Sequence, residues 1–330
     1  MGQILYAAAT IVVGVFLCVA YFWGSNALLD RALPMKGPKA AANVRKANAI
    51  RPWLFLGPSM IVLGLYLVYP VFNSLWLSLH GSGGRDFVGL DNYVWLFGDA
   101  KFLESVRNNL LWLVFVPAMA TFFGLVAAAL TDRIRWGNLA KSLIFMPMAI
   151  SFVGAAVIWK FVYDYRGADQ EQIGLLNAIV VGLGGDPVAW ITVPFWNNFF
   201  LMIILVWIQT GFAMVILSAA LRGIPEETIE AAILDGASPL QIFWRIKIPQ
   251  IWGTIAVVWT TITILVLKIF DIVFAMTNGQ WGSQVLANMM YDWSFRAGDF
   301  GRGSAIAVIL MLAVTPIMVW NIRNARKEGN

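Results

Sequence analysis

Few side chains in this sequence have the types and spacing that chemistry requires. His80 is the only histidine and Cys18 the only cysteine, so no cluster of these residues has the spacing of metal ligands. No Gly-x-x-x-x-Gly-Lys-Ser/Thr stretch is present to hold the phosphates of ATP, and no Gly-x-Ser-x-Gly turn to expose a nucleophile. We therefore expect a chain that is not an enzyme and holds no metal or cofactor, with His80 as an interface residue.

Polar side chains within long apolar runs are the remaining candidates. A charge deep in a membrane costs roughly 2.5–3.5 kcal/mol on insertion scales, so each one needs a partner or a role. Lys268 and Asp271 are three residues apart and can pair on one helix face, either as a structural ion pair or as part of a route. Gln209 and Thr210 lie beside Phe212, which suits either the hydroxyls and ring face of a sugar or interhelical hydrogen bonds.

The apolar runs themselves indicate an integral membrane protein. Of the 330 residues, 60% are hydrophobic and only 12% are charged, a balance that a soluble domain does not have. A helix needs roughly 20 apolar residues to cross a bilayer. The sequence therefore predicts an all-α, polytopic bundle of about seven transmembrane helices, at residues 4–23, 53–78, 109–131, 143–163, 197–218, 253–275 and 303–322.

The distribution of lysine and arginine predicts the orientation of this bundle. Fifteen of these residues lie in the segments 24–52, 132–142, 219–252 and 321–330. Only six lie in the alternate segments 79–108, 164–196 and 276–302. Because cytoplasmic loops carry the excess of positive charge, the first set is predicted to be cytoplasmic, with the C-terminus inside and the N-terminus outside. The net charge of +5 follows from these basic rims and requires no nucleic-acid partner.

The polar loop at 219–252, between the fifth and sixth runs, has the pattern of a helix, a sharp turn and a second helix. Pro225 suits the first position of a helix, where its missing N–H is no loss. Gly236 suits a helix end. Ser238, Pro239 and Gln241 then have the types and spacing of a helix start, with Ser238 as the cap and Gln241 reaching back.

The first of these two helices is expected to have one narrow apolar face. Its members, at helical spacing, are Ile229, Ala232, Ile233 and Gly236. Two interpretations follow from this pattern alone. The loop is either an amphipathic helix resting on the bilayer surface or an element on which a soluble partner acts.

The order of residues in the loop resembles the EAA loop of binding-protein-dependent ABC importer permeases. The sequence runs Glu230-Ala231-Ala232, three residues, Gly236, nine residues, and then Ile246-Lys247-Ile248-Pro249. One departure is Ile248, where the family often has leucine. The pattern is specific because it sets several residues over twenty positions between two predicted spans. We call residues 219–252 the EAA-type loop.

Two further stretches are similar to the carbohydrate-uptake branch of that family, which includes the maltose and glycerol-phosphate permeases. They are Gly89-Leu90-Asp91-Asn92-Tyr93, and Phe270-Asp271 followed by Thr277-Asn278-Gly279. Within this branch the sequence resembles the α-glucoside permeases most. The resemblance covers most of the chain beyond about residue 51.

The resemblance implies a type I ABC importer permease fold, with a membrane anchor and basic connector at 1–52 and a six-helix core at 53–330. It implies two cytosolic ATP-binding subunits that hold ATP and Mg, a second permease subunit as a hetero-pair, and an extracytoplasmic sugar-binding protein. Glu230 is the expected polar contact with the ATPase. The residues expected to couple the chain to it are Glu230, Ala231, Ala232, Asp235, Gly236, Ala237, Pro239 and Pro249.

The same resemblance implies a sugar site in the spans that flank the loop. The expected pathway residues are Gln209, Thr210, Phe212, Leu265, Val266, Lys268, Ile269 and Asp271. Positions 265, 266 and 269 are aliphatic here, where the maltose permease pattern is polar or aromatic. Two alternatives to a site in this chain follow: a site chiefly in the partner permease, or selection by the external binding protein.

Three functions remain open. The first is the permease subunit of an ATP-driven sugar importer in a bacterial-type inner membrane. The second is the same machinery carrying glycerol phosphate or another small polar solute; a phosphate needs basic pathway residues, and only Lys160 and Lys268 are available. The third is a secondary transporter or membrane enzyme. A proton- or sodium-coupled carrier needs buried carboxylates. Asp271 is the only acidic residue within the predicted spans, which disfavours this function.

Overall fold

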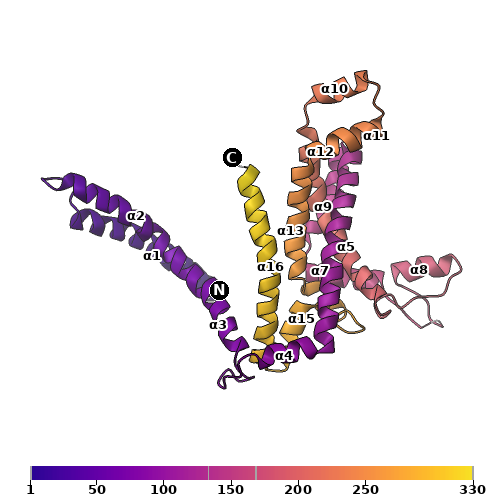
Figure 1. Ribbon diagram of the computed structural model, residues 1–330, viewed down its shortest axis with the longest axis horizontal. Helices are drawn as coiled ribbons and strands as arrows, with labels where there is room; N and C mark the ends of the chain where they lie inside the picture. The colour runs from indigo at the N-terminus through magenta and orange to yellow at the C-terminus, as the bar shows by residue number, and fades with distance from the viewer. Residues whose placement is uncertain (1, 133, 168, 329–330) are drawn as a thin grey trace. The chain divides into compact units, whose positions relative to one another are not determined.

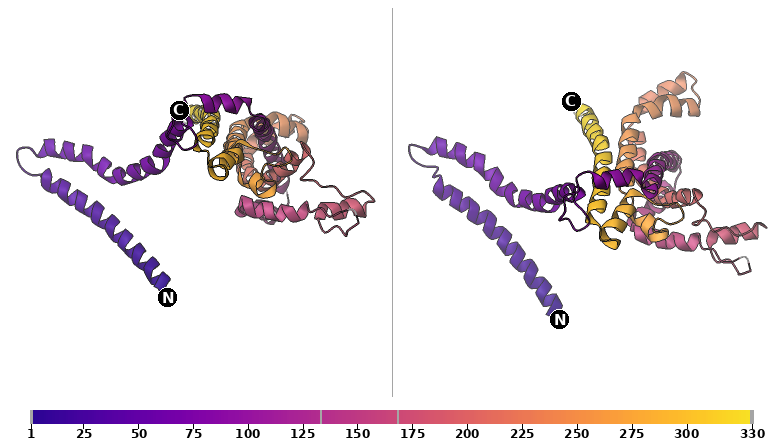
Figure 2. Two further views of the ribbon diagram at one scale, coloured as in Figure 1. Left: turned by 90° about the horizontal axis from the view of Figure 1, so that it is seen from below. Right: turned by 60° about the horizontal axis from the view of Figure 1, so that its bottom comes forward.

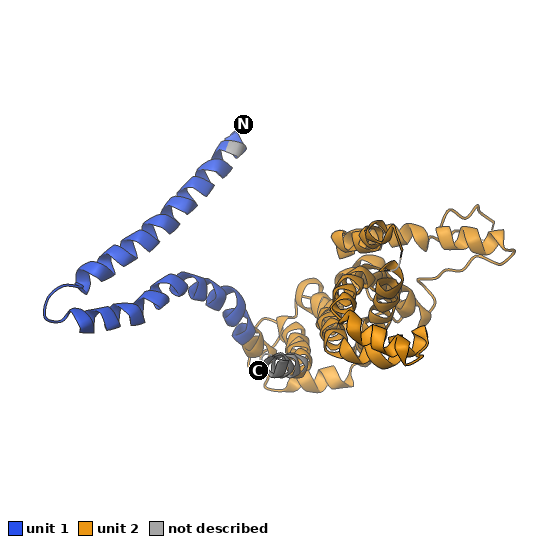
Figure 3. Ribbon diagram, turned by 90° about the horizontal axis from the view of Figure 1, so that it is seen from above, with its two compact units in different colours: residues 1–73 blue, residues 74–330 orange. Residues whose placement is uncertain are grey.

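The computed structural model describes residues 2–132, 134–167 and 169–328, and the chain divides into two compact units (Figure 3). The first unit, residues 1–73, is a hairpin of α1 (Gly2–Ala32) and α2 (Ala40–Leu63), followed by the π-helix η1 (Gly64–Val68) and the start of α3 (Tyr69–Ser78). The Tyr21 hydroxyl donates to the Leu54 carbonyl at 3.1 Å, and Arg51 pairs with Asp30 at 2.6 Å. The predicted boundary after residue 52 lies inside α2 and stays a prediction as a functional division.

The second unit, residues 74–330, is helical throughout its described part, where the one β pairing is an isolated bridge between His80 and Phe87. Its long helices are α5 (Ala100–Thr131), α9 (Trp196–Arg222), α13 (Trp252–Leu267) and α16 (Phe300–Glu328). Its shorter helices are α4 (Asp91–Gly98), α6 (Gly137–Phe145), η2 (Met146–Ala149), α7 (Phe152–Val162), α8 (Leu175–Gly182), α14 (Asp271–Met276), α15 (Leu286–Tyr291) and η4 (Asp292–Arg296).

The core of this unit lies where α5 packs along α9 and α13 packs against α5. Gly124 of α5 explains the close fit, because a Cβ atom there would come within 2.9 Å of the backbone nitrogen of Met214 on α9. Small residues let helix backbones approach in this way within membranes. The side chains between these helices are apolar, and Trp112, Leu205 and Ile262 are almost fully buried.

The predicted membrane character of the fold is confirmed. Four helices are long and apolar enough to cross a bilayer: Leu5–Ala32, Ala40–Ser78, Ala100–Thr131 and Trp196–Arg222. Two bent helix pairs pass the same test together, and Phe300–Pro316 forms a shorter apolar helix. Each of the seven predicted runs overlaps one of these. The described residues hold four helices of sufficient length, or up to six spans if each bent pair is one, so the seventh predicted span, at 303–322, rests on the shorter helix Phe300–Pro316 and stays a prediction.

The predicted span at 143–163 is not a straight helix. The helices Gly137–Ala149 and Phe152–Val162 meet at 105°. Pro147 removes a backbone donor just before the break, and Ile150 is extended (φ −89°, ψ 137°). Ser151 then caps α7, its hydroxyl accepting a hydrogen bond from the Gly154 N–H at 3.1 Å. The chain therefore ends one helix and starts another within the same apolar run.

The predicted span at 253–275 ends early, and this corrects one expectation. α13 stops at Leu267, Phe270 is non-helical (φ −137°, ψ −59°), and Asp271 begins α14. Lys268 and Asp271 therefore do not share a helix face, and no ion pair joins them among the described residues. The carboxylate of Asp271 instead lies in the first turn of α14, where it meets the positive end of the helix dipole.

The two ends of the upright helices carry different elements. Helices α10 (Glu226–Leu234) and α11 (Pro239–Ile242) lie beyond one end of α5, α9 and α13, and α4 and α15 lie at the opposite end (Figure 1). α8 and its flanking loops extend away from the upright helices in every view (Figure 1 and Figure 2). The EAA-type loop and the segment between α14 and α15 are thus at opposite ends of this unit.

Candidate functional site

The EAA-type loop consists of two short helices and a turn, as predicted. α10 and α11 are followed by the π-helix η3 (Phe243–Lys247) and α12 (Ile248–Gln250), and the chain bends by 68° before α13. One detail differs from the prediction. Pro225 is the N-cap of α10 and not its first residue, because its ψ of 130° is extended.

The predicted helix end at Gly236 is confirmed. Its φ is +79°, its N–H donates to the Ile233 carbonyl at 3.0 Å, and the Ala237 N–H donates to the Ala232 carbonyl at 3.0 Å. These two bonds are the Schellman pattern, in which glycine takes the left-handed position. No atom lies within 4 Å of the place where a Cβ would be. Glycine is therefore needed for the turn and not for close approach within this chain.

The predicted second start, at Ser238, is also confirmed. The Gln241 N–H donates to the Ser238 hydroxyl at 3.4 Å, and the Ser238 N–H donates to the Gln241 side-chain carbonyl at 2.8 Å. This reciprocal pair is a capping box, with Pro239 at the first helical position. The two ends of the turn are therefore both closed by local hydrogen bonds.

The predicted apolar face of α10 is only partly covered in this structure. Ala232 is buried and Ile229 half-buried against the core, whereas Ile233 and Gly236 are exposed. Ile233 joins a set of exposed apolar side chains: Ile233 (58%), Leu234 (87%), Leu240 (71%) and Trp244 (58%). Among the other predicted coupling residues, Ala237 is half-buried and the exposed ones are Glu230, Ala231, Asp235, Pro239 and Pro249.

A cluster centred on Asp132 adjoins the start of the loop. Asp132, the C-cap of α5, accepts hydrogen bonds from Lys141 of α6, and from Ser218 (3.0 Å) and Arg222 (2.9 Å) of α9. Burial raises the pKa of Asp132, but the hydrogen bonds from Lys141, Arg222 and Ser218 outweigh it and leave the pKa below its ordinary value. Since Arg222 is the last residue of α9, this cluster ties the loop to two neighbouring helices.

The predicted pathway residues are not gathered into one polar site. Gln209, Val266 and Ile269 are buried; Thr210, Phe212, Leu265 and Asp271 are half-buried, and Lys268 is exposed. The Thr210 hydroxyl donates to the Val206 carbonyl of its own helix at 2.7 Å, and it makes no interhelical bond to the described residues. Thr210 also lines a groove of about 980 Å³ that is otherwise almost wholly apolar, between α5, α6, α7 and α9.

Four buried asparagines form a feature that the sequence analysis missed. We call Asn108, Asn109, Asn197 and Asn198 the asparagine clamp, because they hold the segment between α14 and α15. Asn108 donates to the carbonyls of Gly282 (2.9 Å) and Gln284 (2.8 Å), Asn197 to Trp281 (2.8 Å) and Asn198 to Gly282 (3.1 Å), while Asn109 accepts from the Leu286 N–H (2.9 Å). None is more than 4% exposed.

A signal for this clamp was present in the sequence. Two adjacent asparagine pairs lie at the starts of the third and fifth predicted spans. Buried amides are nearly always hydrogen-bonded, so polar pairs beside apolar runs require partners. Those partners are backbone carbonyls and, for Asn109, a backbone N–H, about 80 to 180 positions later in the chain, which no local pattern identifies.

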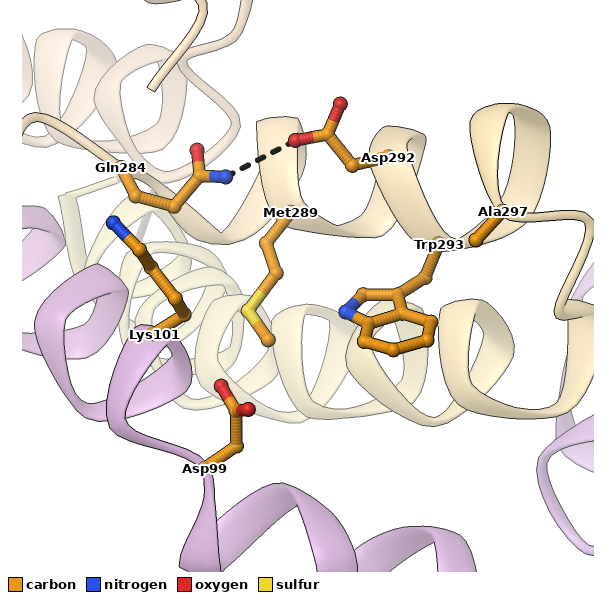
Figure 4. Close-up of a pocket in the computed structure, with 7 residues that line it drawn as sticks. All are labelled: Asp99, Lys101, Gln284, Met289, Asp292, Trp293 and Ala297. Carbon is orange, nitrogen blue, oxygen red and sulfur yellow. Dashed lines mark hydrogen bonds between the residues drawn. The ribbon is translucent and has the colours of Figure 1, made fainter. Parts of the chain in front are cut away.

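A cavity of about 340 Å³ lies beside the clamped segment (Figure 4). Its lining residues are Asp99, Lys101, Gln284, Met289, Asp292, Trp293 and Ala297. Gln284 donates to Asp292 at 3.1 Å, and Asn288 donates to the Gln284 side-chain carbonyl at 2.7 Å. The amides and the carboxylate here bond to one another, so they hold α15 and η4 against the clamped segment.

Residues in the two stretches that resemble the carbohydrate-uptake branch, 89–93 and 270–279, make structural hydrogen bonds in this chain. Asn92 donates to the carbonyls of Ser78 (2.9 Å) and His80 (2.8 Å), which folds the chain back before α4. His80, which is expected to be an interface residue, is only 4% exposed, and its ring stacks on that of Trp76 with the centroids 4.4 Å apart. The Thr277 and Ser283 hydroxyls are 2.6 Å apart and close the clamped segment.

The chain is similar in sequence to permease proteins of known transport systems. Along its whole length the chain is 70% identical to the alpha-glucoside transport system permease protein AglF of Rhizobium meliloti (strain 1021), with 99% of that protein covered. It is 53% identical over 275 residues to the osmoprotective compounds uptake permease protein GgtC of Synechocystis sp., which covers 83% of this chain and 99% of that one.

A chain in the crystal structure of a bacterial ABC transporter involved in the import of the acidic polysaccharide alginate has the same fold. The TM-score is 0.73 at 20% identity, over 86% of this chain and 99% of the other. A family model described as binding-protein-dependent transport system inner membrane component matches residues 120–325, from α5 into α16. The chain therefore belongs to the family of binding-protein-dependent transport system inner membrane components.

Proposed function

We propose that this chain is the permease subunit of an ATP-driven importer of α-glucosides or related oligosaccharides. The observation that carries the proposal is the 70% identity, over the whole chain, to a permease of an α-glucoside transport system. The fold shared with a chain of an alginate importer supports the type of machine. In this function the chain forms the route through the membrane and hydrolyses no ATP itself.

The EAA-type loop is the proposed point of energy input. Leu234 and Leu240 are 87% and 71% exposed at the tip of the loop, and exposed apolar patches mark partner surfaces. Glu230 is exposed on the same loop and supplies the polar contact. The turn at Gly236 and the capping box at Ser238 hold α10 and α11 in one arrangement. A displacement of the loop is therefore transmitted to the membrane-spanning helices.

The proposed mechanism is a two-state change of the membrane helices. Closure of two cytosolic ATP-binding subunits moves the EAA-type loop, and the Asp132 cluster passes that movement to α5 and α6 as well as α9. The spans then change between inward-open and outward-open states, with nucleotide and substrate binding setting the balance. ATP and Mg belong to the partner subunits.

The remaining partners and the orientation are part of the same proposal. A second permease subunit completes the route as a hetero-pair, and an extracytoplasmic sugar-binding protein delivers the cargo. The loop and the C-terminus face the cytoplasm, and the N-terminus faces outward. The excess of lysine and arginine in the segments 24–52, 132–142, 219–252 and 321–330 supports this orientation.

A second cargo is supported by one observation. The 53% identity to a permease for osmoprotective compounds favours another small polar solute carried by the same machinery. Coupling through the EAA-type loop is the same for either cargo, so the residues of this loop do not distinguish the two functions.

Reconstitution of the complete complex in proteoliposomes tests the proposal. ATPase activity is measured with binding protein loaded from a panel of α-glucosides, other sugars and osmoprotective solutes. We expect at least tenfold stimulation by an α-glucoside. Stimulation by an osmoprotective solute alone supports the second cargo. Uptake that needs no ATP-binding subunit contradicts the proposal and favours a secondary transporter.

A further inference from the structure

The clamped segment presents one aromatic side chain, Trp281, in a backbone conformation that tryptophan rarely adopts. Its φ is +54°, and the φ angles of Asn278, Gly279 and Gly282 are +51°, +72° and +78°. A bulky residue at positive φ is strained, and the strain persists only where the surroundings impose it. The side chain is only partly buried in return, since the residue is 45% exposed.

The asparagine clamp is what imposes this conformation. Asn197 donates to the carbonyl of Trp281 itself at 2.8 Å, and Asn108 and Asn198 donate to the next carbonyl, that of Gly282. All three asparagines are fully buried, so these bonds do not compete with water. The backbone beneath the indole is therefore anchored to α5 and α9, and the ring projects from a rigid base.

The indole of Trp281 lines a cavity of about 320 Å³. The other lining residues come from the end of α7, from the chain before α9 and from α14: Lys160, Tyr163, Asp164, Tyr165, Ala189, Ile191, Thr192 and Met276. This volume falls at the small end of the range for ligand sites. The cavity lies at the end of α9 opposite the EAA-type loop, because Ala189, Ile191 and Thr192 precede the first turn of α9 and the loop follows its last turn.

We propose that this cavity is an entry subsite for one glycosyl unit of the imported sugar, an inference that rests on the proposed function. An indole face binds the apolar face of a pyranose ring, and the ammonium of Lys160 offers donors to its hydroxyls. The Asp164 carboxylate pairs with Arg166 at 3.7 Å and the Thr192 hydroxyl donates to the Ala189 carbonyl at 3.0 Å, but both oxygens keep lone pairs that can accept from a sugar hydroxyl. The groove at Thr210 is almost wholly apolar, and in the cavity of Figure 4 the amides and the Asp292 carboxylate already bond to each other. The Trp281 cavity combines an aromatic residue with the charged residues Lys160 and Asp164 on its wall.

The test compares Trp281→Ala with Trp281→Phe in proteoliposomes of the complete complex, with maltose as the probe and saturating binding protein. Trp281→Ala is expected to lower the uptake rate at least tenfold and to leave the KM for loaded binding protein within twofold. Trp281→Phe keeps an aromatic face and is expected to retain most of the uptake. Trp196→Ala, which removes an exposed tryptophan at the start of α9 outside the cavity, is expected to transport normally.

The outcomes separate this inference from the proposed function. If the wild-type complex takes up no α-glucoside, both are overturned. If the wild type transports maltose and Trp281→Ala does so equally well, only the subsite is overturned. A raised KM for loaded binding protein with an unchanged maximal rate also overturns it, because Trp281 then contacts the binding protein. Should Trp281→Ala fail to accumulate, Lys160→Met and Tyr165→Ala must show the tenfold loss, and normal uptake in both would refute the subsite.

Discussion

At the scale of single residues, Gly236 shows how one backbone angle bears on the proposed coupling. It ends α10 with φ +79°, and open space surrounds the position of its missing Cβ. A β-branched side chain in this left-handed conformation costs roughly 1–2 kcal/mol, so the turn would open. We expect Gly236→Val to reduce ATP-driven uptake more than tenfold in proteoliposomes while membrane insertion stays normal.

Gly236→Asn is the matched control for that substitution. Asparagine enters the left-handed region far more readily than valine, so this variant keeps the turn while adding a side chain of similar size. It is expected to retain at least half of the wild-type uptake. Normal transport by Gly236→Val would mean that coupling does not depend on the Schellman turn.

Asp132 gives a pH dependence with a definite sign. A carboxyl whose pKa is lowered by folding stabilises the folded state above the pKa of the unfolded chain, and this contribution is lost as the pH falls through the folded pKa. An ordinary aspartate has a pKa of about 3.9, so the loss lies below about pH 4. We expect Asp132→Asn to lower the Tm of detergent-purified protein by about 2–4 °C at pH 7, which is roughly 1 kcal/mol.

The difference between Asp132→Asn and the wild type should shrink progressively as the pH falls below about 4, because the wild type then loses the contribution of the ionised carboxylate. The exposed Asp186 provides the control, and Asp186→Asn is expected to leave the Tm unchanged over the same pH range. A Tm difference that does not shrink as the pH is lowered from 7 through the acid range to the lowest pH at which the protein stays folded would show that charge on Asp132 is not what holds the ends of α5, α6 and α9 together.

At the scale of elements, the asparagine clamp joins α5 and α9 to the segment between α14 and α15. Asn108→Ala removes the hydrogen-bond donor of the Gly282 and Gln284 carbonyls. The Gly282 carbonyl keeps its bond from Asn198, whereas the Gln284 carbonyl accepts from no other side chain in the described part of the chain. An unsatisfied buried carbonyl costs about 1–3 kcal/mol, and the segment should open locally. With Cys18→Ser and Ser283→Cys in place, maleimide should label the buried position 283 faster when Asn108→Ala is added.

Asn138→Ala is the control for the clamp, because Asn138 is exposed on α6 and lies outside the segment. Its labelling rate at position 283 should equal that of the parent carrying Cys18→Ser and Ser283→Cys. If Asn108→Ala leaves that rate unchanged as well, the segment is held by other contacts, such as the hydrogen bonds from Asn197 and Asn198 to the carbonyls of Trp281 and Gly282.

The elements also show which parts of the structure the sequence can predict. The turn at Gly236 and the cap at Ser238 follow from bonds that span five residues or fewer, so their residue types are sufficient signals. The bond from Asn108 to Gly282 joins residues 174 positions apart, and nothing near Asn108 identifies its partner. The bend before Ser151 and the end of α13 at Leu267 lie inside continuous apolar runs, where hydropathy predicts a span and is silent about its shape.

At the scale of the whole molecule, the proposed function depends on which end of the second unit faces the cytoplasm. The EAA-type loop lies at one end of the upright helices and the clamped segment at the other (Figure 1), so one accessibility measurement orients both. The chain has a single cysteine, Cys18, and Cys18→Ser provides a cysteine-free background. Leu234 in the loop and Leu183 after α8 are 87% and 84% exposed, which makes them matched reporters.

In that background, a membrane-impermeant maleimide is expected to label Leu183→Cys in spheroplasts and to leave Leu234→Cys unlabelled until the membrane is permeabilised. The reason is the charge bias, since 219–252 belongs to the segments rich in lysine and arginine and 164–196 does not. The reverse pattern would place Glu230 and the exposed leucines outside, beyond the reach of any ATP-binding subunit. Energy input through this loop would then be impossible, and the Trp281 cavity would face the cytoplasm as an exit and not an entry.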